Sequence, residues 1–252
     1  IGPDGILKDT NRLIVTIKDE YSDIVDYINS LYSQSIHGNA GTRVGAKEQI
    51  FDQLTYTQTK LDKKLIGDIK EGKYKLIIIT GNAGDGKTAF IRKVEGQDPN
   101  RTALPNRNGA KFTLNGIPFI SNYDGSQDEE ERANDEVLAE FFKPFYHLPQ
   151  YDHLSEGRII AINEGRLIDF LHSQPALRQL DDNIEDYFYR EGHVELLPGL
   201  MVINLNLRSV TARGEDDTPS LLAQQIKAIT QPELWTKCQG CPVADRCYIR
   251  YN

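Results

Sequence analysis

Residues 75–88, KLIIITGNAGDGKT, form the stretch of the sequence that decides the fold. Its first part, Lys75–Thr80, is a nearly continuous apolar, β-branched run, which is typical of a strand buried on both faces. The next part, Gly81–Thr88, matches the pattern G-x4-G-K-[ST], and a helix-compatible segment, Ala89–Lys93, follows it. A buried strand, a glycine-rich turn and a helix in this order predict a loop that binds phosphate groups.

The residue types of this loop suit a nucleoside triphosphate. Its glycines let the backbone curl until successive N–H groups point at phosphate oxygens, and the following helix adds its positive N-terminal end. We expect Lys87 to reach the β- and γ-phosphates and the Thr88 hydroxyl to ligate Mg²⁺. A chance match is the alternative, and the strand before the motif argues against it. The residues predicted to bind ATP are Gly81, Asn82, Ala83, Gly84, Asp85, Gly86, Lys87, Thr88 and Ala89.

Outward from the loop, strand patterns alternate with helix patterns. Further strands are predicted at Ile117–Asn122, Arg158–Asn163 and Leu200–Leu207. Helices are predicted through Leu61, Leu65 and Ile69; from a cap at Ser126 to before Pro144; through Leu167, Phe170 and Leu171; through Leu177, Leu180, Ile184 and Phe188; and through Leu222, Ile226 and Ile229. This alternation predicts an α/β fold with a mostly parallel sheet between helices. With the phosphate loop, it predicts the three-layer αβα fold of P-loop NTPases, of the additional-strand (ASCE, AAA-like) type.

The chain divides into three predicted parts. Residues 1–70 are a mostly helical segment, 71–213 the P-loop NTPase core, and 214–252 a helix with a cysteine-containing appendage. The first part holds a short strand pattern (13–17), helix patterns (around 24–31 and 46–54) and a glycine-rich loop (37–45). Because the sequence begins with Ile1 rather than Met and its last part resembles an interrupted segment, we expect a piece of a longer protein.

Composition excludes several classes of protein. The 252 residues are 39% apolar and 26% charged, as in an ordinary globular protein. No apolar run approaches the roughly 18 residues that a membrane-spanning helix needs, so no membrane segment is expected. The formal net charge of −8 argues against a whole surface that grips DNA or a membrane.

Two strand ends offer acids that could complete the site. Arg158–Glu164 resembles a Walker B strand in which Asn163 stands where an aspartate usually orients Mg²⁺, and Glu164 would be the general base that activates water. The alternative is a strand exit in which Glu164 is favoured by the helix dipole of a first turn. Asp124, after the strand at Ile117–Asn122, could supply the missing acid for Mg²⁺, or could belong to a simple Asp-Gly turn.

A third strand end carries two more catalytic candidates. Asn206 resembles a sensor residue that bonds the γ-phosphate or the attacking water. Arg208 could be an arginine finger or sensor, and its alternative is an exposed surface arginine. With Lys87 and Glu164, these two complete the predicted catalytic set.

The three cysteines lie within ten residues of one another, at Cys238, Cys241 and Cys247. The two-residue spacing of the first pair allows both thiolates to hold one ion. The interpretations are a structural Zn²⁺, an iron–sulfur cluster with an outside ligand, or a reduced cluster without metal. An odd number of grouped cysteines favours a reducing, cytoplasmic compartment over a disulfide framework.

Four segments resemble prokaryotic anti-phage ATPases: GNAGDGKT (81–88), IIAINEGRL (159–167), INLNLRS (203–209) and CQGCPVADRCYIRYN (238–252). They are similar to the ATPase component of DNA phosphorothioation-dependent restriction, the Dpt F-type family. The resemblance spans residues 71–252. It implies a Mg²⁺-dependent ATPase in a complex whose other subunits contact DNA. An oligomer of this chain is compatible with that role. The chain departs from usual P-loop ATPases at Asn163, where an aspartate is usual, and this change would affect its rate of ATP hydrolysis.

Two other functions fit the same motifs. The first is a nucleotide-dependent switch that binds ATP and hydrolyses it slowly, as Asn163 suggests. The second is a P-loop kinase that phosphorylates a small molecule. The kinase is less well served, since the stretch from Arg158 to Arg213 lacks a dense arginine-rich lid.

Overall fold

The computed structural model describes residues 57, 59–82, 84–126, 133–190, 193–214, 218–232, 234–235, 240–242 and 244–246. Residues Gln58–Ser209 form one compact unit, and the described residues from Val210 onward belong to a second. The first unit therefore includes the helix through Leu65 and Ile69, which the sequence placed before the core. The predicted strand, helices and glycine-rich loop before residue 57 lie outside the described residues.

The described helices are α4 (Lys60–Lys70), α5 (Lys87–Glu95), α6 (Asn134–Phe142), α7 (Glu164–His172), α8 (Arg178–Tyr189) and α9 (Leu221–Ile229). The strands are β1 (Leu76–Thr80), β2 (Thr102–Ala103), β3 (Ala110–Leu114), β4 (Ile117–Asn122), β5 (Gly157–Ala161) and β6 (Leu200–Asn204). Short 3₁₀ turns occur at η1 (Lys143–Phe145), η2 (Pro175–Leu177), η3 (Leu205–Leu207) and η5 (Ala244–Arg246).

Within the described residues the strands form one mixed sheet in the order β2-β3-β4-β5-β1-β6. The pairs β4–β5, β5–β1 and β1–β6 are parallel, and β2–β3 and β3–β4 are antiparallel. The four parallel strands therefore end at one edge, at Thr80, Asn122, Ala161 and Asn204, which we call the carboxyl edge. Loops after parallel strands gather at this edge, where α/β proteins commonly bind ligands.

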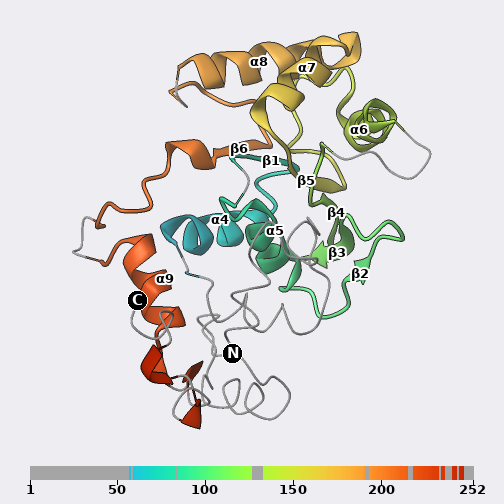
Figure 1. The fold of residues 1–252 in the computed structure, drawn as a ribbon. Helices are drawn as coiled ribbons and strands as arrows, with labels where there is room; N and C mark the ends of the chain where they lie inside the picture. Colours follow the sequence, from blue (N-terminus) through green and yellow to red (C-terminus); the bar gives the residue numbers. More distant parts are fainter. Residues whose placement is uncertain are drawn as a thin grey trace. The chain divides into compact units, whose positions relative to one another are not determined.

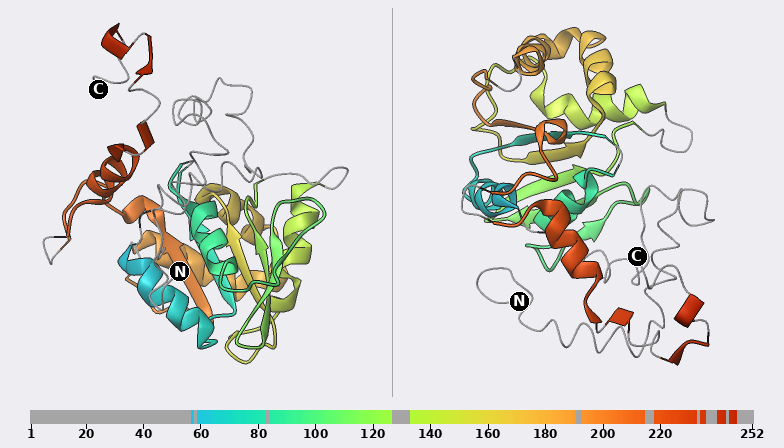
Figure 2. Two further views of the ribbon diagram at one scale, coloured as in Figure 1. Left: turned by 90° about the horizontal axis from the view of Figure 1, so that it is seen from below. Right: turned by 60° about the vertical axis from the view of Figure 1, so that its left-hand side comes forward.

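Helices cover both faces of this sheet (Figures 1 and 2). On one face, α6, α7 and α8 pack on alternate strand residues such as Leu76, Ile78 and Ile160. On the other face, α4 and α5 pack on the intervening residues, such as Ile77 and Ile79. All five residues of β1 are buried, which explains its unbroken apolar sequence. The predicted α/β class is confirmed.

The antiparallel edge of the sheet was not predicted. Strand β3 alternates buried and exposed residues, because only one of its faces is covered. It joins β4 through Asn115 and Gly116, which have φ values of 47° and 80°. Asn-Gly with positive φ at both positions is the preferred two-residue hairpin turn. The sheet is therefore mixed at this edge, where sequence patterning alone indicated only a loop followed by a single strand.

Several predicted boundaries are wrong. The strand expected at Arg158–Asn163 ends at Ala161, and Asn163 is instead the N-cap of α7. The helix expected to follow a cap at Ser126 begins at Asn134, with Ala133 as its N-cap, and residues 127–132 between them lie outside the described part. The strand expected to run to Leu207 ends at Asn204, where the Asn204 side chain accepts a hydrogen bond from the Asn206 amide and starts η3. Short asparagine side chains favour such turns over strands.

The remaining predicted helices are confirmed as α4, α7, α8 and α9. Helix α4 begins at a capping box in which the Thr59 hydroxyl and the Asp62 carboxylate bond each other's backbone N–H groups. Helix α9, in the second unit, begins with the Ser220 hydroxyl accepting a bond from the Ala223 amide. In the described parts of the chain, no helix combines the length and the apolar character that a membrane span requires.

Candidate functional site

The predicted phosphate loop lies between the carboxyl end of β1 and the start of α5. Gly81, Gly84 and Gly86 have φ values of 150°, 90° and 87°, a region that residues with side chains rarely adopt. Gly86 is the N-cap of α5, so the loop ends on the first N–H groups of that helix. A Cβ atom at Gly81 would lie 2.9 Å from both the Asp85 carboxylate and the Leu205 side chain. The glycines of the motif are therefore required by backbone geometry. Ala83 lies outside the described residues.

The Lys87 side chain folds back over this loop. Its Nζ donates hydrogen bonds to the Gly81 and Asn82 carbonyl oxygens, at 2.7 and 2.8 Å. Burial lowers the pKa of Lys87, and the negative charges of Asp85 and Asp124 oppose this shift. The ammonium group is thus held by main-chain carbonyls at the phosphate loop, where an anion can replace these weaker acceptors.

Arg208 also contacts the phosphate loop. It follows η3 after β6 and donates from Nη2 to the Asp85 carbonyl oxygen at 2.9 Å. Its Nε is buried and has no hydrogen-bond partner among the described residues. The Asp85 carboxylate closes the loop from inside by accepting the Asn82 N–H at 2.5 Å. The interpretation of Arg208 as an exposed surface arginine is therefore wrong, and its guanidinium lies beside the predicted phosphate site.

Asp124 is the acid at the strand end that contacts Thr88. Tyr123 is the residue before Asp124, and its carbonyl oxygen accepts a hydrogen bond from the Thr88 hydroxyl at 3.3 Å. The charge of Asp124 is close enough to Lys87 to raise its pKa. Asp124 also forms the predicted turn, because its Oδ1 accepts the Ser126 N–H at 2.9 Å. The turn interpretation of Asp124 is therefore confirmed, and its role as a Mg²⁺ ligand stays a prediction.

Asn163 and Glu164 lie at the end of β5, the strand directly beside β1. Asn163 is the N-cap of α7, yet its exposed side chain makes no capping hydrogen bond. Glu164 is the first residue of α7 and is half-buried. The contact with Thr88 comes instead from β4, the next strand outward. This arrangement favours Asp124 over the Asn163 position as the metal-orienting end of a strand, and leaves Glu164 as a prediction for the base.

Asn206 lies in the turn η3 and is exposed, rather than in a strand as predicted. Its backbone N–H donates to the Asn204 side chain at 3.0 Å. Its sensor role stays a prediction.

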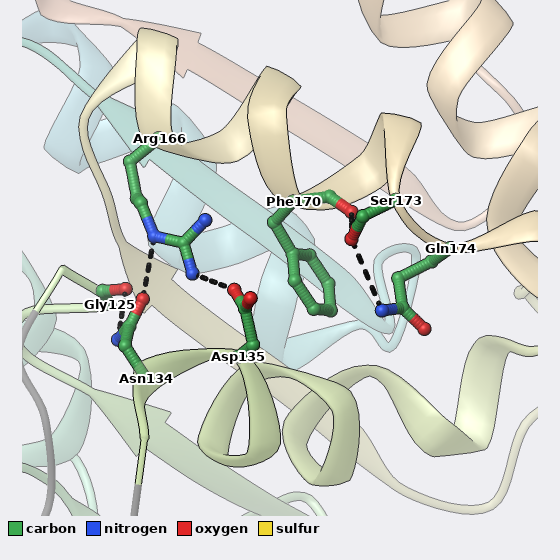
Figure 3. A network of polar contacts seen from close by, with 7 residues as sticks. All are labelled: Gly125, Asn134, Asp135, Arg166, Phe170, Ser173 and Gln174. Atoms are coloured by element: carbon green, nitrogen blue, oxygen red, sulfur yellow. Dashed lines mark hydrogen bonds and ion pairs between the residues drawn. The ribbon is translucent and has the colours of Figure 1, made fainter.

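Side chains join the ends of β4 and β5 (Figure 3). Arg166, in the first turn of α7, donates from Nε to Asn134 Oδ1 at 2.6 Å and forms an ion pair with Asp135. Asn134 in turn donates to the carbonyl oxygen of Gly125 at 2.9 Å. The segment after Glu164 and the turn after Asp124 are therefore connected through the start of α6.

Sequence reasoning missed two buried polar residues behind Asp124. Glu95, at the end of α5, accepts hydrogen bonds from the hydroxyl groups of Ser121 and Tyr123. Desolvation raises the pKa of the Glu95 carboxyl. Asn108 bonds the backbone on both sides of Asp124. Neither residue stands in a recognisable motif, and only a buried position distinguishes them from surface residues of the same type.

The cysteine prediction lies mostly outside the described part of the chain. Cys238 and Cys247 are not described, and Cys241 is half-buried. Within the described residues, no group of three or more His, Cys, Asp and Glu side chains could hold a metal ion. A Zn²⁺ or iron–sulfur site at the three cysteines therefore stays a prediction, which metal analysis of the full chain would test.

The carboxyl edge thus brings together a glycine loop, a lysine, a threonine hydroxyl, an arginine and the carboxylates of Asp85 and Asp124. Lys87 and Thr88 belong to one segment, and Asp124 and Arg208 come from two others that are far from it in the sequence. Positive groups at a glycine-rich loop that leads into a helix suit a polyphosphate, and a threonine hydroxyl that contacts the residue before an aspartate suits Mg²⁺. Comparisons with protein-family models, curated proteins and solved structures gave no match.

Proposed function

We propose that the chain binds ATP with Mg²⁺ at the phosphate loop and hydrolyses it. The observation that carries this proposal is the meeting of the phosphate loop with the end of β4, where Thr88 contacts Tyr123 beside Asp124. With this meeting, the sheet order β4-β5-β1-β6 supports a P-loop NTPase fold of the additional-strand type, because one strand separates β1 from β4.

The residues present fit both ligands. Loop N–H groups and the Lys87 ammonium would hold the phosphates, and Arg208 lies beside the loop with a buried, unpartnered Nε. Thr88 and Asp124 would hold Mg²⁺ through hydroxyl and carboxylate oxygens. When bound, Mg²⁺ would neutralise charge on the β- and γ-phosphates.

Glu164 is the proposed general base. It starts α7 at the carboxyl edge, after the strand beside β1, and the Arg166 contacts fix that turn. Its task would be to accept a proton from the attacking water. Lys87 and Arg208 would offset the negative charge that develops on the transferred phosphoryl group.

Phosphate release tests this function. The parent chain is expected to release phosphate from ATP with Mg²⁺, and Glu164→Gln to lower the rate by about 100-fold or more while ATP binding persists. As a control, Glu156→Gln changes a half-exposed carboxylate that pairs with Arg158, at the amino end of β5. A rate for Glu164→Gln equal to that of the parent would exclude Glu164 as the base. Phosphate found on an added metabolite instead of in solution would favour a small-molecule kinase.

A nucleotide-dependent switch is the second candidate. It is favoured by Glu164 standing at the first position of α7, where the helix dipole favours an acid without any catalytic role. In that case the parent binds ATP with Mg²⁺ but releases no phosphate, alone or with partners.

We also propose that this ATPase serves a cytoplasmic DNA-directed defence complex of the phosphorothioation-dependent type. The support is the resemblance of the four quoted segments, and the net charge of −8 suits contact with DNA through partner subunits. DNA added together with those subunits is expected to stimulate phosphate release. Equal stimulation by DNA alone would contradict an indirect contact.

A further inference from the structure

The loop before β3 lies against the turn that carries Asp124. Asn108, in this loop, is only 6% exposed. Its side-chain Nδ2 donates to the Asp124 carbonyl oxygen at 3.0 Å, and its Oδ1 accepts the Asp124 N–H at 3.0 Å. One amide therefore holds the backbone on both sides of a single residue.

The remaining hydrogen-bonding groups of Asn108 are used as well. Nδ2 donates to Asn122 Oδ1 at 3.2 Å, and Asn122 Oδ1 also accepts the Asp124 N–H at 3.0 Å. The Asn108 carbonyl oxygen accepts the Tyr123 N–H at 3.0 Å. An amide with all its partners in place has one favoured orientation, because rotating it would leave buried donors unpaired.

The position of Asn108 is itself fixed from both sides. Its own N–H donates to Asn106 Oδ1 at 3.0 Å. Gly109 follows with a φ of 156° and lies so close to β4 that a Cβ atom there would come within 2.0 Å of the Ser121 carbonyl oxygen. The loop is therefore packed on β4 along its backbone, and it presents Asn108 to Asp124 in a set place.

From these contacts we propose that Asn108 is a positioning residue for Asp124. By holding the backbone of Asp124, it would set the place of the carboxylate whose charge acts on Lys87, next to the residue that Thr88 contacts, and so orient it for Mg²⁺. The proposal rests on the proposed function, in which Asp124 orients that ion. Groups that orient a metal ligand typically change metal affinity by about 10- to 100-fold when they are removed.

The test measures how far Mg²⁺ strengthens nucleotide binding, which does not depend on hydrolysis. A ribose-labelled fluorescent ATP is titrated into the full chain with Mg²⁺ and again with EDTA, and the ratio of the two affinities is the Mg²⁺ enhancement. Asn108→Ala is expected to lower this enhancement by about tenfold or more, with the EDTA affinity within about twofold of the parent. Asn100→Ala, which changes an exposed asparagine of the preceding loop, serves as the matched control and is expected to change neither.

A second pair of variants separates positioning from a general structural role. In an Asp124→Asn background, Asn108→Ala is expected to lower the enhancement by less than about twofold further, because its effect passes through Asp124. Asn108→Ser leaves a hydroxyl and a smaller cavity, and replaces Asn108→Ala if thermal melting shows that the alanine variant is unfolded.

The possible outcomes are distinct. The proposed function and this proposal are both overturned if the parent does not bind the labelled ATP. They are also both overturned if its affinity is the same with Mg²⁺ and with EDTA. A parent that responds to Mg²⁺, with a folded Asn108 variant that responds equally, overturns this proposal alone. A further loss in the Asp124→Asn background as large as that in the parent also overturns it, since Asn108 would then act by another route.

Discussion

The ends of β4 and β5 differ in which groups hold the backbone around the acid at each end. At the end of β4, the backbone of Asp124 bonds Asn108 on both sides, and the preceding carbonyl accepts the Thr88 hydroxyl. At the end of β5, Asn163 is exposed and its side chain does not cap the helix that follows. Both ends lie at the carboxyl edge, and both carry an acid.

This difference supports a different proposed role for each acid, Asp124 as a metal ligand and Glu164 as a general base. A metal-orienting carboxylate needs a fixed place, and Asp124 has one because buried amides hold its backbone. A general base has to meet a water molecule, and half-buried Glu164 at a helix start is compatible with that. The pattern of hydrogen bonds therefore supports Asp124 as the proposed metal ligand, and the role of Glu164 as a base stays a prediction.

The largest expected effect comes from exchanging the two acids for amides. Asp124→Asn is expected to lower the Mg²⁺ enhancement of ATP binding by about 10- to 100-fold, whereas Glu164→Gln leaves it within about twofold. Fluorescence titration with Mg²⁺ and with EDTA measures both variants. The reverse result, with Glu164→Gln losing the enhancement, would place the metal at the end of β5.

A glycine pair tests the packing behind β4. Gly109→Ala is expected to lower the free energy of unfolding by about 2–4 kcal/mol, because its Cβ would meet the Ser121 carbonyl at 2.0 Å. Gly67→Ala, in the middle of α4 with no atom within 4 Å of the new Cβ, is expected to raise it by about 0.5–1 kcal/mol. Urea unfolding measures both. Equal stabilities for the two variants would contradict the close approach of the loop to β4.

The link between the two strand ends is expected to have a smaller effect. Arg166→Ala removes the bonds to Asn134 and Asp135, and should lower the free energy of unfolding by about 1–2 kcal/mol. The control is Arg178→Ala, whose exposed guanidinium lies 4.0 Å from the Asp182 carboxylate and should change stability by less than about 0.5 kcal/mol. If thermal unfolding finds the two variants alike, the network in Figure 3 adds no stability.

The smallest expected effect is a pH dependence that originates at Glu95. Desolvation raises the pKa of Glu95, against hydrogen bonds from Ser121 and Tyr123 and the charges of Arg101 and Arg92. The folded protein then keeps a proton that the unfolded chain releases, so the free energy of unfolding falls as pH rises from the ordinary glutamate pKa through the raised value. Glu95→Gln is expected to flatten this fall in urea titrations at several pH values. An unchanged slope would assign the dependence to other groups.

Much of the fold could be predicted because strong local patterns mark it. The apolar run of β1 and the glycines after it indicate a buried strand followed by a turn. The helical spacing of Leu167, Phe170 and Leu171 predicted α7. Strand β3 was missed because it is short and only three of its five residues, Ala110, Phe112 and Leu114, are apolar and buried. The dipeptide Asn115-Gly116 is a typical two-residue hairpin turn, and it predicts a strand on each side of it.

The site could be predicted only in part. The phosphate loop is continuous in the sequence, so Lys87 and Thr88 were found directly. The choice between Asp124 and Asn163 depends on which strand end contacts Thr88, and contacts between segments far apart in the sequence leave no local signal. Asn108 was passed over for the same reason, since its partners lie on β4 and in the turn after it.

Every role proposed for the carboxyl edge requires ATP binding at the phosphate loop, and calorimetry with Mg²⁺ and ATP measures this binding directly. The parent chain is expected to bind, Lys87→Ala to lose about 10- to 100-fold in affinity, and Lys64→Ala, which changes an exposed lysine of α4, to match the parent. No heat of binding in the parent, or equal affinities for the parent and Lys87→Ala, would contradict the account.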